Sequence, residues 1–357
     1  MAVKGATSGG DGGAIARDAD EIDELRWVDL ARVRSRASIV HANVTALERT
    51  AEKRMQGCAY VDGAYVAPED AKISIFDWGF LHSDATYDVA HVWQGRFFRL
   101  DDHLARFEAS LAALRLDPGL TRAQMREVMH ECVRRAGLAD AYVEVLCTRG
   151  RPAPGSRDPR TCVNRFMAFA IPFVWIADPE KQKRGIDLVV GTPQRIPPAS
   201  VDPRIKNYHW MDFVMGLFEA YERGGETVVL TDGHGHVTEG PGFNVFAVFA
   251  AQGSAPARVV TPAAGVLEGI SRRTAIELAQ AAGLAVEQRL LPVDELRRAD
   301  EIFLSSTGGG VIPIATLDGV TVGGRRPGEF GPVSALLQQR YWALHDDPKF
   351  VEPVRAV

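Results

Sequence analysis

One lysine of this chain stands in a setting that could change its chemistry. Lys206 follows a proline-rich approach, lies close to the aromatic residues Tyr208 and Trp210, and precedes a predicted helix. A lysine that is partly removed from water has a lowered pKa, and its free amine can form a Schiff base with a carbonyl group. Judged by its neighbours alone, a solvated loop lysine is the ordinary interpretation.

Two short segments could bind an anion. Residues 269–271 lead into a predicted helix, where free backbone N–H groups and the positive end of the helix dipole favour a phosphate. Residues 305–310, Ser-Ser-Thr-Gly-Gly-Gly, follow an apolar strand, and their hydroxyls and unhindered amides also suit phosphate oxygens. A helix cap and a plain turn are the simpler interpretations. The G-x-x-x-x-G-K-[ST] motif is absent, so the pair points to a cofactor phosphate rather than a nucleoside triphosphate.

Other polar residues give weaker signals. Glu239 ends a predicted strand and leads into residues 240–242, where the backbone could approach a ligand closely, although a generic strand-end carboxylate fits the same pattern. Residues 82–84, His-Ser-Asp, are adjacent and cannot converge as a catalytic triad. His234 and His236 have no third ligand at a recognisable spacing, so the sequence predicts no metal site.

Hydrophobic periodicity predicts the elements of the first half of the chain. Residues 59–66 alternate around Asp62-Gly63 and predict a β-hairpin. Buried strands are expected at residues 142–147 and 166–174. The loop 150–160 between them is rich in proline, glycine and arginine, and it is either a surface connection or a lid.

Two helices are predicted between that hairpin and those strands. Asp101 is a plausible N-cap for a helix whose apolar residues recur at intervals of three and four, and Arg106 lies off its apolar stripe. Thr121 and Gln124 form a capping-box pattern for a second helix that stops at Gly137. In the second half, strands are expected at 186–190 and 228–231, around Phe246 and at 302–304, with another hairpin turning at Asp232-Gly233 and helices at 212–222 and 271–282.

Composition bounds the class of protein. The 357 residues carry 41 Lys plus Arg against 46 Asp plus Glu, and the net charge of −5 argues against nucleic acid or an anionic membrane as the main partner. A single core rarely grows past roughly 250 residues, so two domains are expected. We place a flexible tail at 1–20, an N-terminal α/β domain at 21–174, a linker at 175–185 and a C-terminal domain at 186–357. The four cysteines show no paired spacing, and with no membrane span or leader signal we expect a cytoplasmic protein with reduced thiols.

Five segments in order carry a resemblance to a known family. They are residues 75–107, 201–213, 238–244, 266–275 and 305–313. Together they resemble the fold-type IV pyridoxal-phosphate aminotransferases, and within them most closely the (R)-selective amine transaminases. The resemblance runs from about residue 58 to about residue 341. It implies a small N-terminal and a larger C-terminal α/β domain with the active site between them, and a homodimer with shared active sites.

The resemblance implies roles for individual residues. Lys206 would be the Schiff-base lysine and proton shuttle, and Glu239 would pair with the pyridine nitrogen of pyridoxal 5'-phosphate and hold it protonated. The phosphate ligands would be Arg106, Ile270, Ser271 and Thr307. The substrate space would be lined by His82, Tyr87, Val89, Trp210 and Gly308, some of them from the neighbouring subunit. Arg157 in the loop, with Arg151 as an alternative, would pair with a substrate carboxylate.

Three positions depart from the family pattern. Pro241 stands where relatives usually carry Ser or Thr, which removes a hydroxyl contact to the cofactor. Ser271 replaces the commoner Thr and keeps the hydroxyl. Gly308 stands where close relatives often carry Ala, and the missing methyl group would enlarge the small side of the pocket.

The expected activity is that of an aminotransferase of the EC 2.6.1 class. An (R)-amine would give up its amino group, and pyruvate or a similar keto acid would accept it. D-amino-acid aminotransferase, branched-chain amino-acid aminotransferase and an aminodeoxychorismate-type lyase are the alternatives of the same fold. A cofactor-binding protein without turnover is a further alternative, although it would need neither Lys206 nor Glu239.

Overall fold

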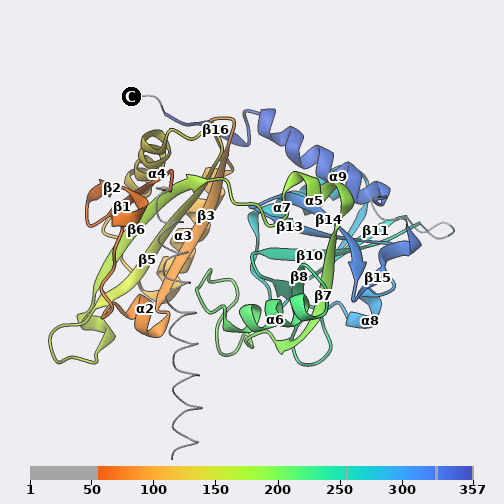
Figure 1. Cartoon of the computed structure of the whole chain (residues 1–357), viewed down its shortest axis with the longest axis horizontal. Coiled ribbons are helices and arrows are strands. Elements are labelled where there is room, and N and C mark those ends of the chain that lie inside the picture. The colour runs from red at the N-terminus through yellow and green to blue at the C-terminus, as the bar shows by residue number, and fades with distance from the viewer. Residues whose placement is uncertain (1–54, 252, 254–255, 326–328, 356–357) are drawn as a thin grey trace, which may run out of the picture. The chain divides into compact units, whose positions relative to one another are not determined.

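The computed structural model describes residues 55–251, 253, 256–325 and 329–355. The predicted tail at 1–20 and residues 21–54 of the predicted first domain lie outside this described part. The described chain folds into two β-sheets with helices packed on them (Figure 1). This confirms the predicted α/β class.

Seven strands form the first sheet, in the order β16-β4-β3-β5-β6-β1-β2, and neighbouring strands are antiparallel. The predicted hairpin is confirmed as β1 and β2, which meet at Asp62-Gly63. The strands are β1 Cys58–Val61, β2 Ala64–Val66, β3 Ala85–Trp93, β4 Arg96–Phe98, β5 Ala141–Arg151, β6 Val163–Pro172 and β16 Val351–Pro353.

Two strands of this sheet are longer than their apolar runs. The predicted strands 142–147 and 166–174 correspond to β5 and β6, whose pairing continues until Arg151 lies opposite Val163. Backbone hydrogen bonds extend a strand beyond its buried side chains, so the polar residues of β5 gave no apolar signal. At its other end β6 stops at Pro172, which can donate no ladder hydrogen bond.

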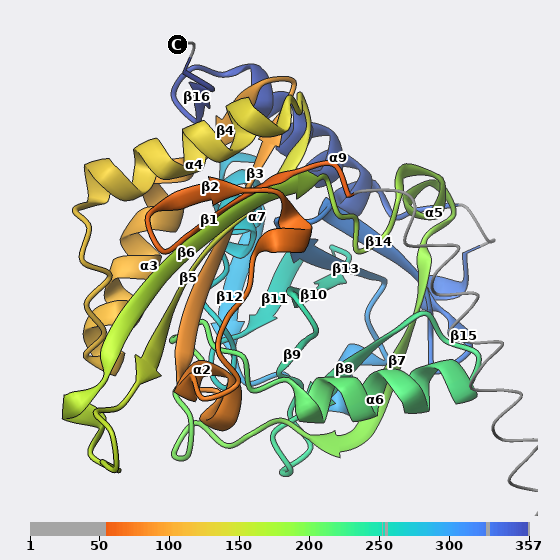
Figure 2. The ribbon, with the colours of Figure 1, turned by 60° about the vertical axis from the view of Figure 1, so that its left-hand side comes forward.

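Helices α3 Leu100–Leu114 and α4 Arg122–Ala136 cover one face of the first sheet (Figure 2). The capping box of α4 is present, with Thr121 and Gln124 bonding each other's backbone N–H, and the helix ends at Gly137. The predicted N-cap of α3 is wrong. Arg99, at φ +51°, caps the helix, because β4 runs to Phe98 and the chain must reverse within one residue. Asp101 lies in the first turn of α3 instead.

Nine strands form the second sheet, which mixes parallel and antiparallel pairs. They are β7 Ile186–Gln194, β8 Thr227–Thr231, β9 Glu239–Gly240, β10 Phe243–Phe249, β11 Arg258–Pro262, β12 Ala285–Arg289, β13 Glu301–Ser306, β14 Gly310–Leu317 and β15 Val320–Thr321. The predicted turn at Asp232-Gly233 brings Val237 back against Thr231, but β9 then pairs with β10 and does not extend that hairpin.

Three longer helices pack on the second sheet. Helix α6 Met211–Glu222 lies on β7 and β8, while α7 Ile270–Ala281 and α9 Pro332–Ala343 pack on each other and against β13 and β14. Helices α6 and α7 each begin one residue before the predicted position. The shorter helices are α2 Trp78–His82, α5 Pro179–Arg184 and α8 Val293–Leu296, and the 3₁₀ turns are Pro68–Asp70, Pro159–Thr161, Val322–Gly324 and Leu344–Asp346.

The chain passes between the two sheets through the predicted linker region. Residues 173–185 connect β6 to β7, and α5 occupies part of them. Near the other end, β16 returns to pair with β4, so the last described residues belong to the first sheet. Within the described residues, no helix has the length and apolarity that a membrane crossing requires.

Candidate active site

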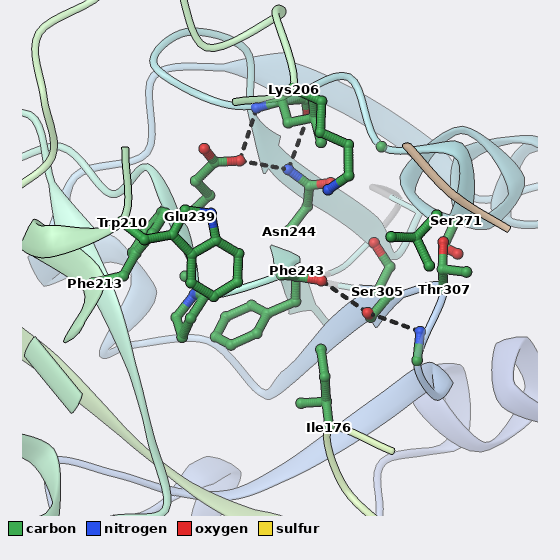
Figure 3. Close-up of a pocket in the computed structure, with 18 of the residues that line it drawn as sticks. Ile176, Lys206, Trp210, Phe213, Glu239, Phe243, Asn244, Ser271, Ser305 and Thr307 are labelled. Atoms are coloured by element: carbon green, nitrogen blue, oxygen red, sulfur yellow. Dashed lines mark hydrogen bonds between the residues drawn. The ribbon is translucent and has the colours of Figure 1, made fainter. Parts of the chain in front are cut away.

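A cavity of about 410 Å³ is lined by residues from both sheets. Figure 3 shows part of its lining. Trp210 and Phe213 lie along one side of it, and Ser271, Ser305 and Thr307 lie along the other. The structure brings ten of the predicted site residues to this cavity: Tyr87, Val89, Arg106, Lys206, Trp210, Glu239, Ile270, Ser271, Thr307 and Gly308.

Lys206 lies in the irregular segment between β7 and α6, and its backbone is tied to the first sheet. Its carbonyl accepts hydrogen bonds from Thr86 Oγ1 at 2.7 Å and from the Tyr87 N–H at 3.2 Å. Its N–H donates to Ser110 Oγ on α3 at 3.3 Å. The ammonium Nζ lies 4.3 Å from the centre of the Tyr87 ring, a cation–π distance. Of the lysines that the structure describes, Lys206 is the one that lines the cavity.

Glu239 is buried at the start of β9, and three groups hold its carboxylate. The Leu267 N–H donates to Oε2 at 2.7 Å, Arg195 Nε donates to Oε1 at 3.4 Å, and Asn244 Nδ2 donates to Oε2 at 3.5 Å. Burial raises the pKa of Glu239 to about 7, against the Leu267 hydrogen bond and the charges of Arg195 and Lys206, which lower it. A carboxylate in this state can hold or release a proton near neutral pH.

Arg106 reaches the cavity from α3 and is fixed by Asp88 on β3. Its Nε and Nη2 each donate to one carboxylate oxygen of Asp88 at 2.8 Å. Burial alone would raise the pKa of Asp88, but the Arg106 charge and a hydrogen bond from His103 outweigh it and hold the pKa well below its ordinary value. Arg106 Nη1 donates to the Glu268 carbonyl at 3.2 Å, which places the guanidinium beside the segment that leads into α7.

The start of α7 offers free donors to the cavity. Its N-cap, Gly269, has no side chain to bond the first N–H groups, so the helix presents open N–H donors and the positive end of its dipole. Ser271 is the second residue of the helix and bonds Tyr341 OH at 2.8 Å, so it is not the cap. Among the described residues, Ser305 Oγ is one of three buried side-chain polar atoms without a hydrogen-bond partner. A phosphate group fits here, because it would supply acceptors to donors that lack one.

Successive side chains of β3 point alternately to this cavity and to α3. Tyr87 and Val89 point to the cavity, and the residue between them, Asp88, points to α3, as period-two alternation requires. From β5, Tyr142 lines the same wall. The wall near Lys206 is therefore largely aromatic.

Gly308 lies where the second sheet approaches the segment that follows β6. Its carbonyl accepts from the Ile176 N–H at 2.8 Å. A Cβ atom at this position would lie 2.9 Å from the Val174 carbonyl oxygen, closer than real Cβ atoms come. Pro241, the other departure from the family pattern, also lines the cavity.

Two predicted substrate residues do not line this cavity in the described chain. His82 ends the short helix α2, where its ring packs edge-on against Trp78 at 4.9 Å. Arg157 is exposed in the loop between β5 and β6, and Arg151 is exposed at the end of β5. Their predicted roles stay predictions. Among the described residues, no group of three or more His, Cys, Asp or Glu side chains is placed to bind a metal ion.

Sequence reasoning missed the residues that hold the site residues in place. Arg195 bonds Asp212 at 2.8 Å as well as Glu239, and its guanidinium lies 4.2 Å from the centre of the Phe213 ring. Nothing in the local sequence around Arg195 indicates these partners. The role of Asp88 could have been predicted from the sequence, because side chains alternate along a strand, and Asp88 therefore points to the face opposite Tyr87 and Val89, toward Arg106.

Comparisons with known proteins agree with this geometry. Residues 85–317 match the family model described as Amino-transferase class IV. The chain is 31% identical over 271 residues to a putative branched-chain-amino-acid aminotransferase of Methanocaldococcus jannaschii, a match that covers 76% of this chain and 91% of the relative. It is 29% identical over 269 residues to D-alanine aminotransferase of Bacillus licheniformis, with 75% and 90% covered.

A solved structure agrees as well. The crystal structure of a branched-chain aminotransferase from Thermoproteus uzoniensis with norvaline aligns with a TM-score of 0.74 and 25% identity, over 84% of this chain and 99% of that chain. Class IV aminotransferases use pyridoxal 5'-phosphate as their cofactor. Because the family model spans more than half of the chain, this protein belongs to the class IV aminotransferases, with fold type IV and pyridoxal 5'-phosphate as its cofactor.

Proposed function

We propose that this aminotransferase takes the amino group of an (R)-amine and passes it to pyruvate or a similar keto acid. Lys206 and Glu239 carry the chemistry in this proposal, and Arg106 and the start of α7 hold the phosphate. When bound, pyridoxal 5'-phosphate supplies an aldehyde for the amine and a ring that accepts electrons.

The phosphate end would be held by Arg106, Thr307 and the start of α7. Backbone N–H groups of Ile270 and Ser271 and the positive end of the α7 dipole favour an anion there. Arg106 keeps its direction because Asp88 binds it through two hydrogen bonds. The unpartnered Ser305 hydroxyl is a further donor in this wall.

Glu239 would hold the proton of the pyridine nitrogen. The Leu267 N–H and Arg195 fix its carboxylate, and the carboxylate is buried. A carboxylate that faces a positive partner in a dry site strengthens the positive form of that partner. This assignment explains why an acid whose pKa burial raises to about 7 stands in the cavity.

Lys206 would be the amine that binds the cofactor and then moves a proton to and from the reacting carbon. Its backbone is fixed by three hydrogen bonds to β3 and α3, while its side chain lies free along the Tyr87 ring. A fixed backbone with a movable Nζ suits a group that must act at two positions.

One observation favours an amine over an amino acid at the donor end. Two arginines line the cavity: Arg106, which Asp88 orients, is assigned to the phosphate, and Arg195 is held by Asp212 and Glu239. Within the described residues, the wall near Lys206 offers aromatic side chains instead of a free guanidinium. An apolar amine suits such a wall, and Arg157 in the exposed loop would serve the carboxylate of the keto acid. The (R) preference rests on the sequence resemblance.

The alternative is an amino-acid aminotransferase. The relatives are described as branched-chain and D-alanine aminotransferases, and they favour this alternative.

An enantiomer comparison tests the proposal. With pyruvate as acceptor, the enzyme is expected to convert (R)-1-phenylethylamine and to leave the (S)-amine nearly unchanged, because the wrong enantiomer forces its large group into the smaller pocket. Arg157→Ala is expected to slow only the pyruvate half-reaction. Equal rates for both enantiomers, or activity confined to L-leucine and L-valine or to D-alanine, would overturn the amine assignment.

We further propose a homodimer whose partner completes the site. Apolar side chains are exposed on the segment around α2 and on the outer face of α6, and they include Phe80 at 65%, Phe218 at 58% and Met211 at 81%. His82, two residues after Phe80 on α2, does not line the cavity of its own chain. A second copy seated on these faces would cover them and could bring His82 to the neighbouring cavity.

A cytoplasmic location is part of the same proposal. All four cysteines are free in the structure, and Cys58, Cys132 and Cys147 are buried. Free thiols agree with a reducing compartment. Burial raises the pKa of Cys147 to about 12, which keeps this thiol unreactive.

A further inference from the structure

A second buried carboxylate lies behind the cavity wall, and the proposed chemistry does not use it. Glu144 stands on β5 opposite Val89 of β3, two residues after Tyr142, so all three side chains point to the cavity side of the first sheet. Glu144 itself is 7% exposed. A buried carboxylate costs stability unless hydrogen bonds and an opposite charge compensate it.

Two tyrosines hold Glu144. Tyr208 OH donates to Oε1 at 2.6 Å, and Tyr142 OH donates to Oε2 at 2.9 Å. Burial and the Glu144 charge raise the pKa of both tyrosines far above the ordinary value, so both hydroxyls keep their protons and donate to the carboxylate. The carboxylate is thereby fixed at both oxygens.

This cluster continues to Lys206 through two rings. The Tyr208 ring stacks on Tyr87 with centres 4.4 Å apart and planes at 19°. Lys206 Nζ lies 4.3 Å from the centre of that same Tyr87 ring. The order of contact is therefore Glu144, Tyr208, Tyr87 and Lys206, and the two ends carry opposite charges.

The charged groups around Lys206 and Glu144 determine which of them compensates the charge of Glu144. Burial raises the pKa of Glu144, while the tyrosine hydroxyls and the positive charge of Lys206 lower it. Other titratable or charged side chains on the packed elements include Asp88 and His91 on β3, His103 and Arg106 on α3, Arg195 after β7 and Glu239 on β9. Asp88 is held by Arg106 and Glu239 by Arg195, so Glu144 is the carboxylate whose charge is balanced by neutral tyrosines and Lys206.

We propose that Glu144, held by Tyr142 and Tyr208, is a positioning residue for Lys206. Through Tyr208 it fixes the Tyr87 ring against which the lysine amine rests, and it places a buried carboxylate at the other end of this row of contacts. The inference rests on the proposed role of Lys206 as the lysine that binds the cofactor. It assigns Glu144 no contact with substrate.

The test compares two variants that each neutralise one buried carboxylate. Glu144→Gln keeps the shape and removes the charge, and Glu301→Gln does the same for a carboxylate that is 5% exposed and binds the first turn of α9. In the holoenzyme, the midpoint of the pH titration of the bound cofactor's visible absorbance is expected to move to lower pH in Glu144→Gln, because the negative charge that attracts the positive lysine end is removed. Glu301→Gln is expected to keep the wild-type midpoint.

A third variant, Tyr208→Phe, separates positioning from charge and guards against misfolding. Tyr208→Phe keeps the ring that stacks on Tyr87 and removes the hydrogen bond to Glu144. The visible circular dichroism of the bound cofactor reports a fixed orientation, and Tyr208→Phe is expected to lose part of that signal. In the same variant kcat is expected to change by a larger factor than KM. Unchanged dichroism in Tyr208→Phe, or an unchanged midpoint in a folded Glu144→Gln, would overturn the proposal.

The Lys206→Ala variant distinguishes this failure from failure of the proposed function. If Lys206→Ala removes the lysine-dependent visible band while Glu144→Gln leaves the midpoint unchanged, only the inference about Glu144 is wrong. If Lys206→Ala keeps that band, the proposed role of Lys206 itself is wrong.

Discussion

Glu239 and Asp88 are both buried, yet their pKa values move in opposite directions. Asp88 has the Arg106 guanidinium at 2.8 Å on both oxygens, and this charge outweighs the effect of burial. Glu239 has Arg195 only at 3.4 Å, and that arginine is shared with Asp212, so burial outweighs the attraction. One carboxylate stays ionised to hold an arginine, and the other is poised near neutral pH.

The first prediction concerns the stability of the cofactor-free protein. The pKa of Glu239 is about 7 in the folded state, against an ordinary 4.5. The folded state therefore keeps the Glu239 proton to a higher pH than the unfolded state does, and the free energy of unfolding falls as the pH rises from 4.5 to 7. In urea unfolding, the free energy of unfolding of the wild type is expected to fall by at most about 3 kcal/mol relative to that of Glu239→Gln over this pH range. Each unit of difference between the folded and unfolded pKa corresponds to about 1.36 kcal/mol. The matched control is Glu222→Gln at an exposed site, where the difference from wild type should stay flat. A pH-independent difference for Glu239→Gln would contradict the proposed state of this carboxylate.

At this scale the sequence indicated the residues but not their partners. Lys206, Glu239 and Arg106 could be predicted because the family pattern marks them. Arg195 could not, because its partners Asp212 and Glu239 lie 17 and 44 residues away and meet it only in the folded chain. The Glu144 cluster was missed for the same reason, since Tyr208 lies 64 residues from Glu144.

Among the elements, β3 and α7 carry most of the site. The nine residues of β3 present Tyr87 and Val89 to the cavity and Asp88 to α3, and α7 turns its uncapped start toward the same cavity. Helices α4, α6 and α7 could be predicted to within a residue from periodicity and capping. The start of α3 could not, because Arg99 in a left-handed conformation replaces an ordinary cap and is held by Asp102, Thr274 and Glu277.

A prediction at this scale concerns the contact between the turn after β13 and the segment after β6. In Gly308→Ala the new methyl group would lie 2.9 Å from the Val174 carbonyl, so one of the two segments must move. We expect kcat/KM for 1-phenylpropylamine to fall about tenfold more than for 1-phenylethylamine, equivalent to about 1.4 kcal/mol of overpacking. Measuring both amines on one variant controls for general damage. Equal losses would show that Gly308 does not shape the smaller pocket.

For the whole molecule, the cavity draws residues from both sheets, so the site depends on how the two sheets meet. The predicted domain boundary at residues 175–185 stays a prediction. The described chain has a connection with a short helix there, and after the second sheet the strand β16 returns to the first sheet. Sequence periodicity predicts elements but does not encode which sheet a terminal strand joins. The pairing of β16 with β4 was for that reason not foreseen.

The proposed homodimer gives the prediction that belongs to this scale. Light scattering on the purified protein is expected to give twice the 38.9 kDa of one chain. Phe218→Asp places a charge on the exposed apolar face of α6 and is expected to shift the protein toward monomer, because burying an unpaired charge is costly. Val320→Asp, at an exposed apolar residue of β15, is the control and should stay dimeric. A monomeric wild type, or equal behaviour of both variants, would rule out this interface.

The central claim, that the cavity binds the cofactor through Lys206, can be tested by locating the bond itself. The chain has seven lysines, so borohydride reduction of the holoenzyme followed by peptide mass spectrometry can place the cofactor on one of them. We expect the phosphopyridoxyl mass to appear on the peptide containing Lys206 and to disappear in Lys206→Ala. Label on another lysine, or label that survives the Lys206→Ala substitution, would contradict the claim.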